Sequence, residues 1–299
     1  MSAKIIEGRS IARGIRARCL ERAMILQQAY GVVPHLAVLL VGNNSASRIY
    51  VNNKIRAAGE AGILARLYEF APNIDPRILF DEIHRLNTDS KTHGILVQLP
   101  LPPQFDILDV LSAISPSKDV DGFHVSNMGG LAVGDPLFRP CTPLGIMKLL
   151  EHERIPIAGQ NAVVVGASNI VGKPMALMMM RREATVSICH ARTRDLAEFT
   201  RLADILVVAA GVPNLIRSEM IKSGAVVVDV GINRLPDNKI VGDVDFDHVR
   251  AKASYITPVP GGVGPMTVSM LLANTVSAAE RILGVTARSE DVGWVRESG

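Results

Sequence analysis

The sequence predicts an α/β protein made of two α/β domains, each built around a parallel sheet. Short apolar runs that fit buried strands alternate with amphipathic stretches that fit helices, and this alternation is typical of parallel strands joined by crossover helices. The chain of 299 residues is long enough to give each domain its own core. Between the two series of elements, residues 115–143 are rich in turn signals, and we expect an interdomain or active-site segment there.

The first series begins with an amphipathic helix over residues 8–30, whose arginines are expected to face solvent. A continuous apolar run over residues 36–41 fits a strand that is buried on both faces. Asn44 or Ser45 is suited to cap the helix that follows. A strand, a helix and a strand are then predicted over residues 63–70, 75–87 and 94–98.

The second series starts with a helix over residues 142–151, a strand over 161–165, a tight turn at Gly166 and a helix over 170–180. Later elements are strands over residues 185–189, 205–209 and 225–230 and a final helix over 267–283. This order is that of a doubly wound, Rossmann-type nucleotide-binding domain.

Composition excludes several classes of protein. Hydrophobic residues make up 48% of the chain and charged residues 20%, yet no apolar run approaches the length of a membrane span. A net charge of +3 is too small and too dispersed to indicate nucleic-acid binding. The three cysteines lack metal-site or disulfide spacing, so no metal is expected. No signal peptide is visible, and a reducing cytoplasm is the expected location.

The turn that begins Gly166-Ala167-Ser168 and ends at Gly172 lies between a predicted strand and a predicted helix. Free backbone N–H groups and the helix dipole favour a pyrophosphate at such a place, although a glycine-rich turn can also be purely structural. The next strand ends in Cys-His-Ala-Arg-Thr, without the acidic residue that usually grips the ribose of NAD. Arg192 there suits a 2′-phosphate, which favours NADP, and the alternative is a surface cation.

Tyr50 and Lys54 are four residues apart on a predicted helix, so their side chains share one face. Short-chain dehydrogenases carry such a pair after their dinucleotide turn, whereas this pair precedes the turn by more than a hundred residues. We therefore expect a separate substrate-binding layer, the alternative being an ordinary helix face. Gln98 closes a strand at the end where parallel sheets bind ligands, and its amide is either a site group or simply makes an edge hydrogen bond. Asp121 precedes a glycine and is either a turn residue or a site residue.

Seven segments together resemble the bifunctional methylenetetrahydrofolate dehydrogenase/methenyltetrahydrofolate cyclohydrolase family. In chain order they span residues 46–54, 94–102, 118–123, 139–143, 165–174, 229–233 and 255–267, and so they are distributed along nearly the whole chain. The Gln-Leu-Pro-Leu and Pro-Gly-Gly-Val-Gly-Pro-Met-Thr stretches are the most specific of these. The nearest alternative is a monofunctional dehydrogenase, and a non-enzymatic NADP sensor is a further one.

The resemblance implies hydride transfer from 5,10-methylenetetrahydrofolate to NADP⁺, followed by hydrolysis of the methenyl product to 10-formyltetrahydrofolate. It implies that Lys54 is the key residue of hydrolysis, with Gln98 bonded to it and holding its protonation state. Tyr50 would stack on the folate and Asp121 would bind the pterin. The implied folate site also includes Val97, Leu99, Pro260, Gly261, Gly262, Val263 and Gly264.

The implied NADP site consists of Gly166, Ala167, Ser168, Arg192, Ile232 and Thr267. Some relatives carry arginine where this chain has Ala167, so the 2′-phosphate contact would fall mainly on Arg192. The resemblance also implies a homodimer and an active-site cleft between the domains. The expected domains are a folate-binding catalytic domain over residues 1–141, completed by the helix over 267–284, a Rossmann domain over 142–266, and a polar tail over 285–299.

Overall fold

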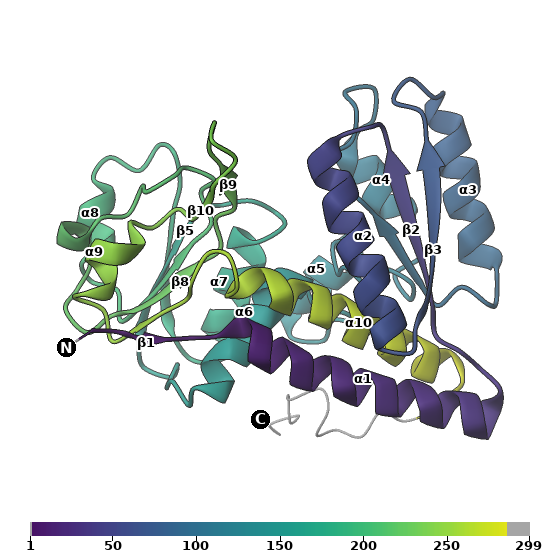
Figure 1. The fold of residues 1–299 in the computed structure, drawn as a ribbon, viewed down its shortest axis with the longest axis horizontal. Helices are drawn as coiled ribbons and strands as arrows, with labels where there is room; N and C mark the ends of the chain where they lie inside the picture. Colours follow the sequence, from purple (N-terminus) through teal and green to yellow (C-terminus); the bar gives the residue numbers. More distant parts are fainter. Residues whose placement is uncertain (1, 286–299) are drawn as a thin grey trace. The chain divides into compact units, whose positions relative to one another are not determined.

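The computed structural model describes residues 2–285 (Figure 1). This part of the chain folds into two compact units, which we name by their sheets. The six-strand unit comprises residues 2–14 and 126–270, and the three-strand unit comprises residues 15–125 and 271–285. Helices α1 (Gly8–Tyr30) and α10 (Val263–Ile282) each continue from one unit into the other. None of the helices in this range is long and apolar enough to span a membrane.

The three-strand unit is a parallel sheet in the order β3 (Leu64–Phe70), β2 (His35–Val41), β4 (Gly94–Val97). Every residue of β2 is buried, as predicted for a strand covered on both faces. Figure 1 shows β2 and β3 between the helices α2 (Ser45–Glu60) and α3 (Pro76–Thr88). A short helix, α4 (Ile107–Ala113), packs with α3. The predicted strand, helix and strand order is confirmed.

The six-strand unit is also parallel, in the order β1-β11-β8-β7-β5-β6. Its strands are β1 (Lys4–Ile5), β5 (Asn161–Val165), β6 (Thr185–Cys189), β7 (Ile205–Val208), β8 (Val226–Asp229) and β11 (Tyr255–Ile256). The chain adds β6 on one side of β5 and then β7 and β8 on the other. The carboxyl end of β5 is therefore the switch point at which doubly wound sheets bind their ligands.

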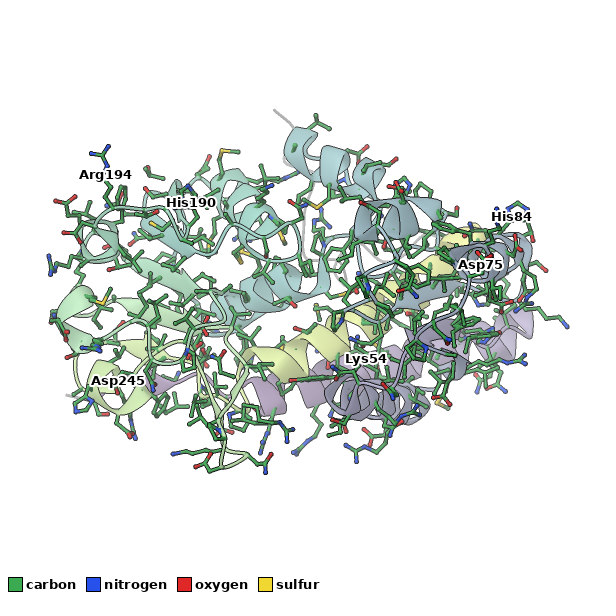
Figure 2. All side chains as sticks on the ribbon, turned by 90° about the horizontal axis from the view of Figure 1, so that it is seen from above. Lys54, Asp75, His84, His190, Arg194 and Asp245 are labelled. Atoms are coloured by element: carbon green, nitrogen blue, oxygen red, sulfur yellow. The ribbon has the colours of Figure 1, made fainter. Side chains whose placement is uncertain are left out.

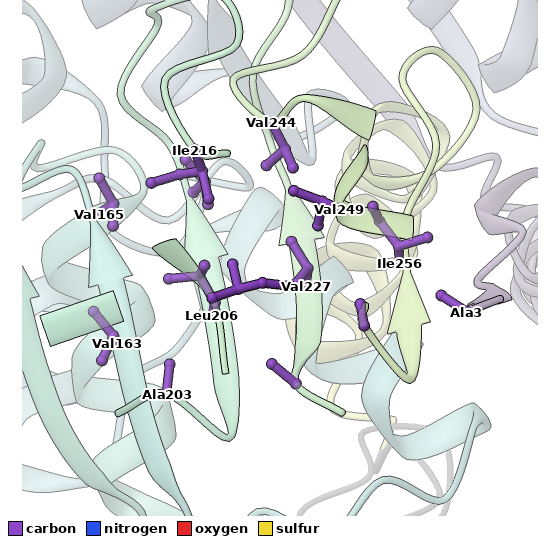
Figure 3. Close-up of a cluster of buried hydrophobic side chains, with 14 of the residues drawn as sticks. Ala3, Val163, Val165, Ala203, Leu206, Ile216, Val227, Val244, Val249 and Ile256 are labelled. Atoms are coloured by element: carbon purple, nitrogen blue, oxygen red, sulfur yellow. The ribbon is translucent and has the colours of Figure 1, made fainter. Parts of the chain in front are cut away.

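One face of this sheet is covered by the cluster of apolar side chains in Figure 3. Val163, Leu206, Val227 and Ile256 contribute to it from four different strands, and Val249 contributes from a helix. Since side chains alternate between the faces of a strand, residues two apart enter the same core. Fully burying each valine, leucine or isoleucine contributes about 1.5–3 kcal/mol, so this core holds the strand ends in fixed positions.

The remaining elements connect these strands. The helices are α5 (Val125–Val133), α6 (Cys141–His152), α7 (Gly172–Arg181), α8 (Leu196–Thr200), η1 (Ser218–Met220) and α9 (Phe246–Arg250). An antiparallel hairpin pairs β9 (Asn233–Arg234) with β10 (Ile240–Val241).

Residues 115–143, which the sequence shows to be rich in turn signals, also contain the helix α5. Gly129 and Gly130 lower the helix propensity of this segment. Gly130 is nevertheless required in the helix, since a Cβ there would lie 2.8 Å from the carbonyl oxygen of Asp135. The segment is helical because its tertiary packing outweighs its local propensity.

The final helix begins at Val263 rather than at residue 267. Val263 and Gly264 therefore belong to its first turn and not to a loop. A backbone hydrogen bond from Gly262 to the oxygen of Pro258 closes the preceding turn, so the helix starts immediately after it. The tail predicted over residues 285–299 lies outside the described residues except for Val285. The functional domains expected over residues 1–141 and 142–266 remain a prediction.

Candidate active site

Helix α2 presents the two residues with which the candidate site of the three-strand unit begins. Its amino end is capped by Asn44, whose side-chain oxygen accepts a hydrogen bond from the backbone N–H of Ser47 at 3.1 Å. This cap supports the predicted helix start. Tyr50 is 40% exposed, and Lys54, labelled in Figure 2, is half-buried one turn later. The phenol and the ammonium thus lie on one face of the helix.

Lys54 contacts the end of the neighbouring strand. Its Nζ donates a hydrogen bond to Oε1 of Gln98 at 3.0 Å. The amide of Gln98 in turn donates from Nε2 to the backbone oxygen of Leu99 at 2.6 Å, which fixes the side of the amide that faces the ammonium. The backbone N–H of Gln98 donates to Leu39 and so extends the β2–β4 pairing. The structure therefore brings together Lys54 and Gln98, which are far apart in sequence.

Asp121 lies in a turn that continues the same sheet. A parallel bridge joins Ile95 to Asp119, so the chain two residues further along reaches the level of the end of β4. The carboxylate of Asp119 accepts hydrogen bonds from the backbone N–H groups of Gly122 at 3.1 Å and His124 at 2.7 Å. These bonds hold the turn around Asp121. The sequence contains this signal as an aspartate three residues before a glycine, although no role was predicted for Asp119.

Lys118 belongs to the same motif but has a structural role. It is buried, and its Nζ donates to the backbone oxygens of Leu86 at 2.8 Å and Asp89 at 2.7 Å. These acceptors lie at the carboxyl end of α3, where helix carbonyls lack partners within the helix. Burial lowers the pKa of Lys118, and the carboxylate of Asp89 opposes this shift.

In the six-strand unit, the predicted phosphate turn follows β5 at the switch point. Gly166 has φ +122°, and a Cβ there would overlap the backbone oxygen of Ala209. A Cβ at Gly172 would overlap the oxygen of Gly166 itself. Both glycines are therefore required by close backbone approach. A hydrogen bond from Gly166 N–H to the oxygen of Cys189 places the turn beside the end of β6.

Ser168 stands where the standard fingerprint has its second glycine, and its side chain closes the turn. Its Oγ accepts hydrogen bonds from the backbone N–H groups of Val171 at 3.1 Å and Gly172 at 3.4 Å. These are groups at the start of α7, where N–H donors lack partners within the helix. The side chain of Ser168 therefore caps the start of α7.

The loop after β6 is shaped by its own hydrogen bonds. The backbone N–H of His190 donates to Oγ1 of Thr193 at 2.9 Å, and the backbone N–H of Arg192 donates to Nδ1 of His190 at 3.1 Å. His190 is labelled in Figure 2. These bonds fold the loop back on itself directly after β6, and the side chain of Arg192 is exposed.

The segment Pro260–Gly264 lies beside a second predicted cofactor residue. A Cβ on Gly264 would come within 4.0 Å of Cδ1 of Ile232, whose side chain is 47% exposed. The oxygen of Gly261 accepts a hydrogen bond from the backbone N–H of Arg9 at 3.1 Å. Thr267, on α10, pairs its hydroxyl with that of Thr142 at 2.9 Å. The loop predicted for folate and the residue predicted for NADP are thus neighbours within one unit.

Comparison with known proteins agrees with this geometry. Residues 6–121 match the tetrahydrofolate dehydrogenase/cyclohydrolase catalytic domain, and residues 140–283 match the NAD(P)-binding domain of the same family. The bifunctional protein FolD of Nitrosospira multiformis is 57% identical over 94% of this chain and 97% of its own length.

Two solved structures are also similar. The bifunctional methylenetetrahydrofolate dehydrogenase/cyclohydrolase FolD of Campylobacter jejuni is 51% identical, with a TM-score of 0.91 over 94% of this chain and 100% of that chain. The Trypanosoma brucei enzyme, solved with NADP cofactor and an inhibitor, is 40% identical, with a TM-score of 0.91 over 95% of this chain and 99% of that chain. This chain belongs to the tetrahydrofolate dehydrogenase/cyclohydrolase family.

Proposed function

We propose which residues of this chain act in each of two reactions. As a family member, the chain is a bifunctional methylenetetrahydrofolate dehydrogenase and methenyltetrahydrofolate cyclohydrolase of one-carbon metabolism, and it uses NADP. In the first reaction 5,10-methylenetetrahydrofolate is oxidised to the methenyl form. In the second, water converts the methenyl form to 10-formyltetrahydrofolate.

We assign hydrolysis to Lys54, and the hydrogen bond between Lys54 and Gln98 is the observation that carries this assignment. Water adds to the methenyl carbon and loses one proton to solvent. The remaining hydroxyl proton leaves as the formyl C=O forms, and N5 gains one proton as its bond to that carbon breaks. A positioned side chain that moves these protons contributes about 10²–10⁴-fold to the rate. Gln98, oriented by its bond to Leu99, holds the ammonium in place for this task.

For the dehydrogenase reaction, NADP⁺ supplies the hydride acceptor, and the protein's work is to orient two carbon atoms. We assign the pyrophosphate to the backbone of Gly166–Ser168 and the 2′-phosphate to Arg192. Ile232 and the segment Pro260–Gly264 border the nicotinamide, since they are neighbours within the six-strand unit. Tyr50 stacks on the folate, and Asp121 accepts hydrogen bonds from the pterin.

We further propose a cytoplasmic homodimer. Cys19, Cys141 and Cys189 are buried and form no disulfide bond in the described part of the chain, which suits a reducing compartment. Strand β6 is an edge of its sheet, and its Ile188 is 43% exposed, so a second copy is a suitable cover. Sedimentation or light scattering at micromolar concentration measures the oligomeric state. A mass near 32.1 kDa would show a monomer and contradict the dimer.

A spectrophotometric assay with 5,10-methylenetetrahydrofolate and either NADP⁺ or NAD⁺ tests the function. We expect NADPH to form while methenyltetrahydrofolate stays low, because hydrolysis removes it. Methenyl absorbance that persists in the unsubstituted protein would favour the monofunctional dehydrogenase. Absence of NADPH formation would contradict the dehydrogenase assignment altogether.

A further inference from the structure

Asp229, at the end of β8, has a buried carboxylate that accepts three backbone hydrogen bonds. Oδ1 accepts from the N–H groups of Gly231 and Asp243, each at 2.9 Å, and Oδ2 accepts from that of Val244 at 3.0 Å. Asp229 is 3% exposed. Its side chain thereby joins the loop that follows β8 to the segment that follows the β9–β10 hairpin.

Asp243 repeats this arrangement toward the next strand. Its Oδ2 accepts from the backbone N–H groups of Ala210 at 2.6 Å and Gly211 at 2.8 Å, and its Oδ1 accepts from Nδ2 of Asn233 at 2.8 Å. Asp243 is fully buried. Its side chain joins the loop after β7 to the hairpin.

The two carboxylates interlock with two glycines. A Cβ at Gly242 would overlap the carboxylate of Asp229, and a Cβ at Gly231 would overlap the carboxylate of Asp243. The carboxylate of Asp229 thus lies against the backbone of Gly242, which precedes Asp243. The carboxylate of Asp243 lies against the backbone of Gly231, two residues after Asp229. We name this pair, Asp229 and Asp243, the carboxylate clasp.

The loops that the clasp holds are those of the predicted cofactor site. Ile232 lies between Gly231 and Asn233, both of which donate to the clasp. Ala209, whose oxygen contacts the phosphate turn at Gly166, directly precedes the donor Ala210. Strands β5, β7 and β8 are neighbours in the sheet, so these loops meet at the edge where a doubly wound fold binds its ligand.

We propose that the carboxylate clasp positions the NADP-binding loops of the dehydrogenase, with Asp243 setting the loop after β7 against the phosphate turn and both aspartates setting the loop that carries Ile232. The inference rests on the proposed assignment of these loops to NADP. Asp229 and Asp243 are positioning residues, because they act through the loops and are themselves buried.

The electrostatics of the pair indicate that the two carboxylates depend on the hydrogen bonds that the loops donate to them. Burial raises the pKa of Asp229 to about 7, while its three backbone donors favour the carboxylate. The nearby charge of Asp243 also raises this pKa. Two carboxyl groups kept this close and this buried are costly, and the donors of the loops offset the cost only while the loops keep this shape.

Substituting Asp243 tests the proposal in the full-length enzyme. Asp243→Ala removes three acceptor contacts, so we expect the KM for NADP⁺ and the Kd for NADPH, measured by fluorescence titration, to rise at least about tenfold. Hydrolysis of supplied methenyltetrahydrofolate, which needs no NADP, should stay within about twofold of the unsubstituted rate.

Two further variants separate positioning from folding. In Asp243→Asn the amide oxygen can still accept from Ala210 and Gly211, and Asn233 can rotate to accept from the new amide, so we expect most of the NADPH affinity to return. Asp247→Ala, an exposed aspartate on the adjacent helix α9, is the matched control and should leave both constants unchanged.

The inference is overturned if Asp243→Ala leaves the KM and the Kd within about twofold of the unsubstituted values. It is equally overturned if the variant cannot be saturated by NADP⁺ and loses hydrolysis to the same extent, since Asp243 would then govern folding. If the unsubstituted protein binds NADPH but forms none from NADP⁺, the proposed dehydrogenase function fails, while the change in Kd still tests the clasp.

Discussion

The candidate sites of the two units differ in whether side chains or the backbone form them. In the three-strand unit the site depends on side chains, since Lys54 reaches Gln98 across two elements through one hydrogen bond. In the six-strand unit the site depends on the backbone, whose turn at Gly166 admits no side chain and whose loops are held by buried carboxylates. Hydrolysis should therefore respond to the chemical identity of a few side chains, and NADP binding to the shape of loops. Substitutions can separate the two.

The largest effect is expected from Lys54→Met, which keeps the length of the side chain and removes its ammonium. We expect hydrolysis of methenyltetrahydrofolate to be abolished, with a loss of about 10³-fold or more. Arg56→Met, two residues further along the same helix and exposed, is the control and should leave hydrolysis unchanged. Full cyclohydrolase activity in the Lys54 variant would remove Lys54 from its assigned role.

Gly166→Ala should weaken NADP⁺ binding at the phosphate turn of the six-strand unit. The new Cβ overlaps the oxygen of Ala209, and φ +122° strains any residue with a side chain, so the turn must move. We expect the KM for NADP⁺ to rise at least about tenfold, corresponding to about 1.4 kcal/mol, while hydrolysis of supplied methenyltetrahydrofolate is retained.

Gly159→Ala is the matched control for the turn. Gly159 also has a positive φ of +73°, but a Cβ there meets nothing within 4 Å. It should cost about 1–2 kcal/mol of stability with no change in the KM for NADP⁺. Equal KM changes in the two variants would show that strain alone, and not the contact with Ala209, explains the effect at Gly166.

The stability of the two units should depend on pH in opposite directions. Burial lowers the pKa of His93, in the three-strand unit, to about 4, and its Nδ1 accepts a hydrogen bond from the backbone of His35. Between about pH 6.5 and 4, His93 is protonated in the unfolded chain but not in the folded chain. The free energy of unfolding therefore falls as pH falls through this window, by up to about 3 kcal/mol.

The titration of Asp229 changes the stability of the six-strand unit in the opposite direction with pH. Its pKa of about 7 in the folded state exceeds the ordinary value of 3.8, so the folded chain binds the extra proton in that window and stability falls as pH rises through it. Hydrogen exchange at pH 5 and pH 7, corrected for intrinsic rates, measures each unit separately. Between pH 7 and pH 5, β2 and β4 should lose protection relative to β7 and β8, and a uniform change would contradict this.

The smallest effect is expected from Arg192→Ala, because the side chain is exposed and water screens its charge. We expect the KM for NADP⁺ to rise about tenfold or less, with little change for NAD⁺. Arg194→Ala, in the same exposed loop and labelled in Figure 2, is the control. An equal effect on both cofactors would refute the 2′-phosphate assignment.

Elements with strong local signals could be predicted closely from the sequence. The helix over residues 8–30 and the strands over 161–165 and 185–189 have the predicted bounds, since their periodicity and apolar runs are unambiguous. The two-residue strands β1 and β11 were not predicted. They are too short to carry a pattern, and only pairing between distant segments makes them strands.

The same division applies to the candidate sites. The sequence alone determined the fold class, the family resemblance, the glycines of the phosphate turn and the pairing of Tyr50 with Lys54 on one helix, because each is a local pattern or a fixed spacing. The resemblance already implied a bond between Lys54 and Gln98, and the structure gives its distance of 3.0 Å. Only the tertiary structure decided that Asp119 holds the turn of Asp121. It also revealed the carboxylate clasp. The physical reason is that a buried polar group must find its partner in space, and distance along the chain does not specify which partner that is.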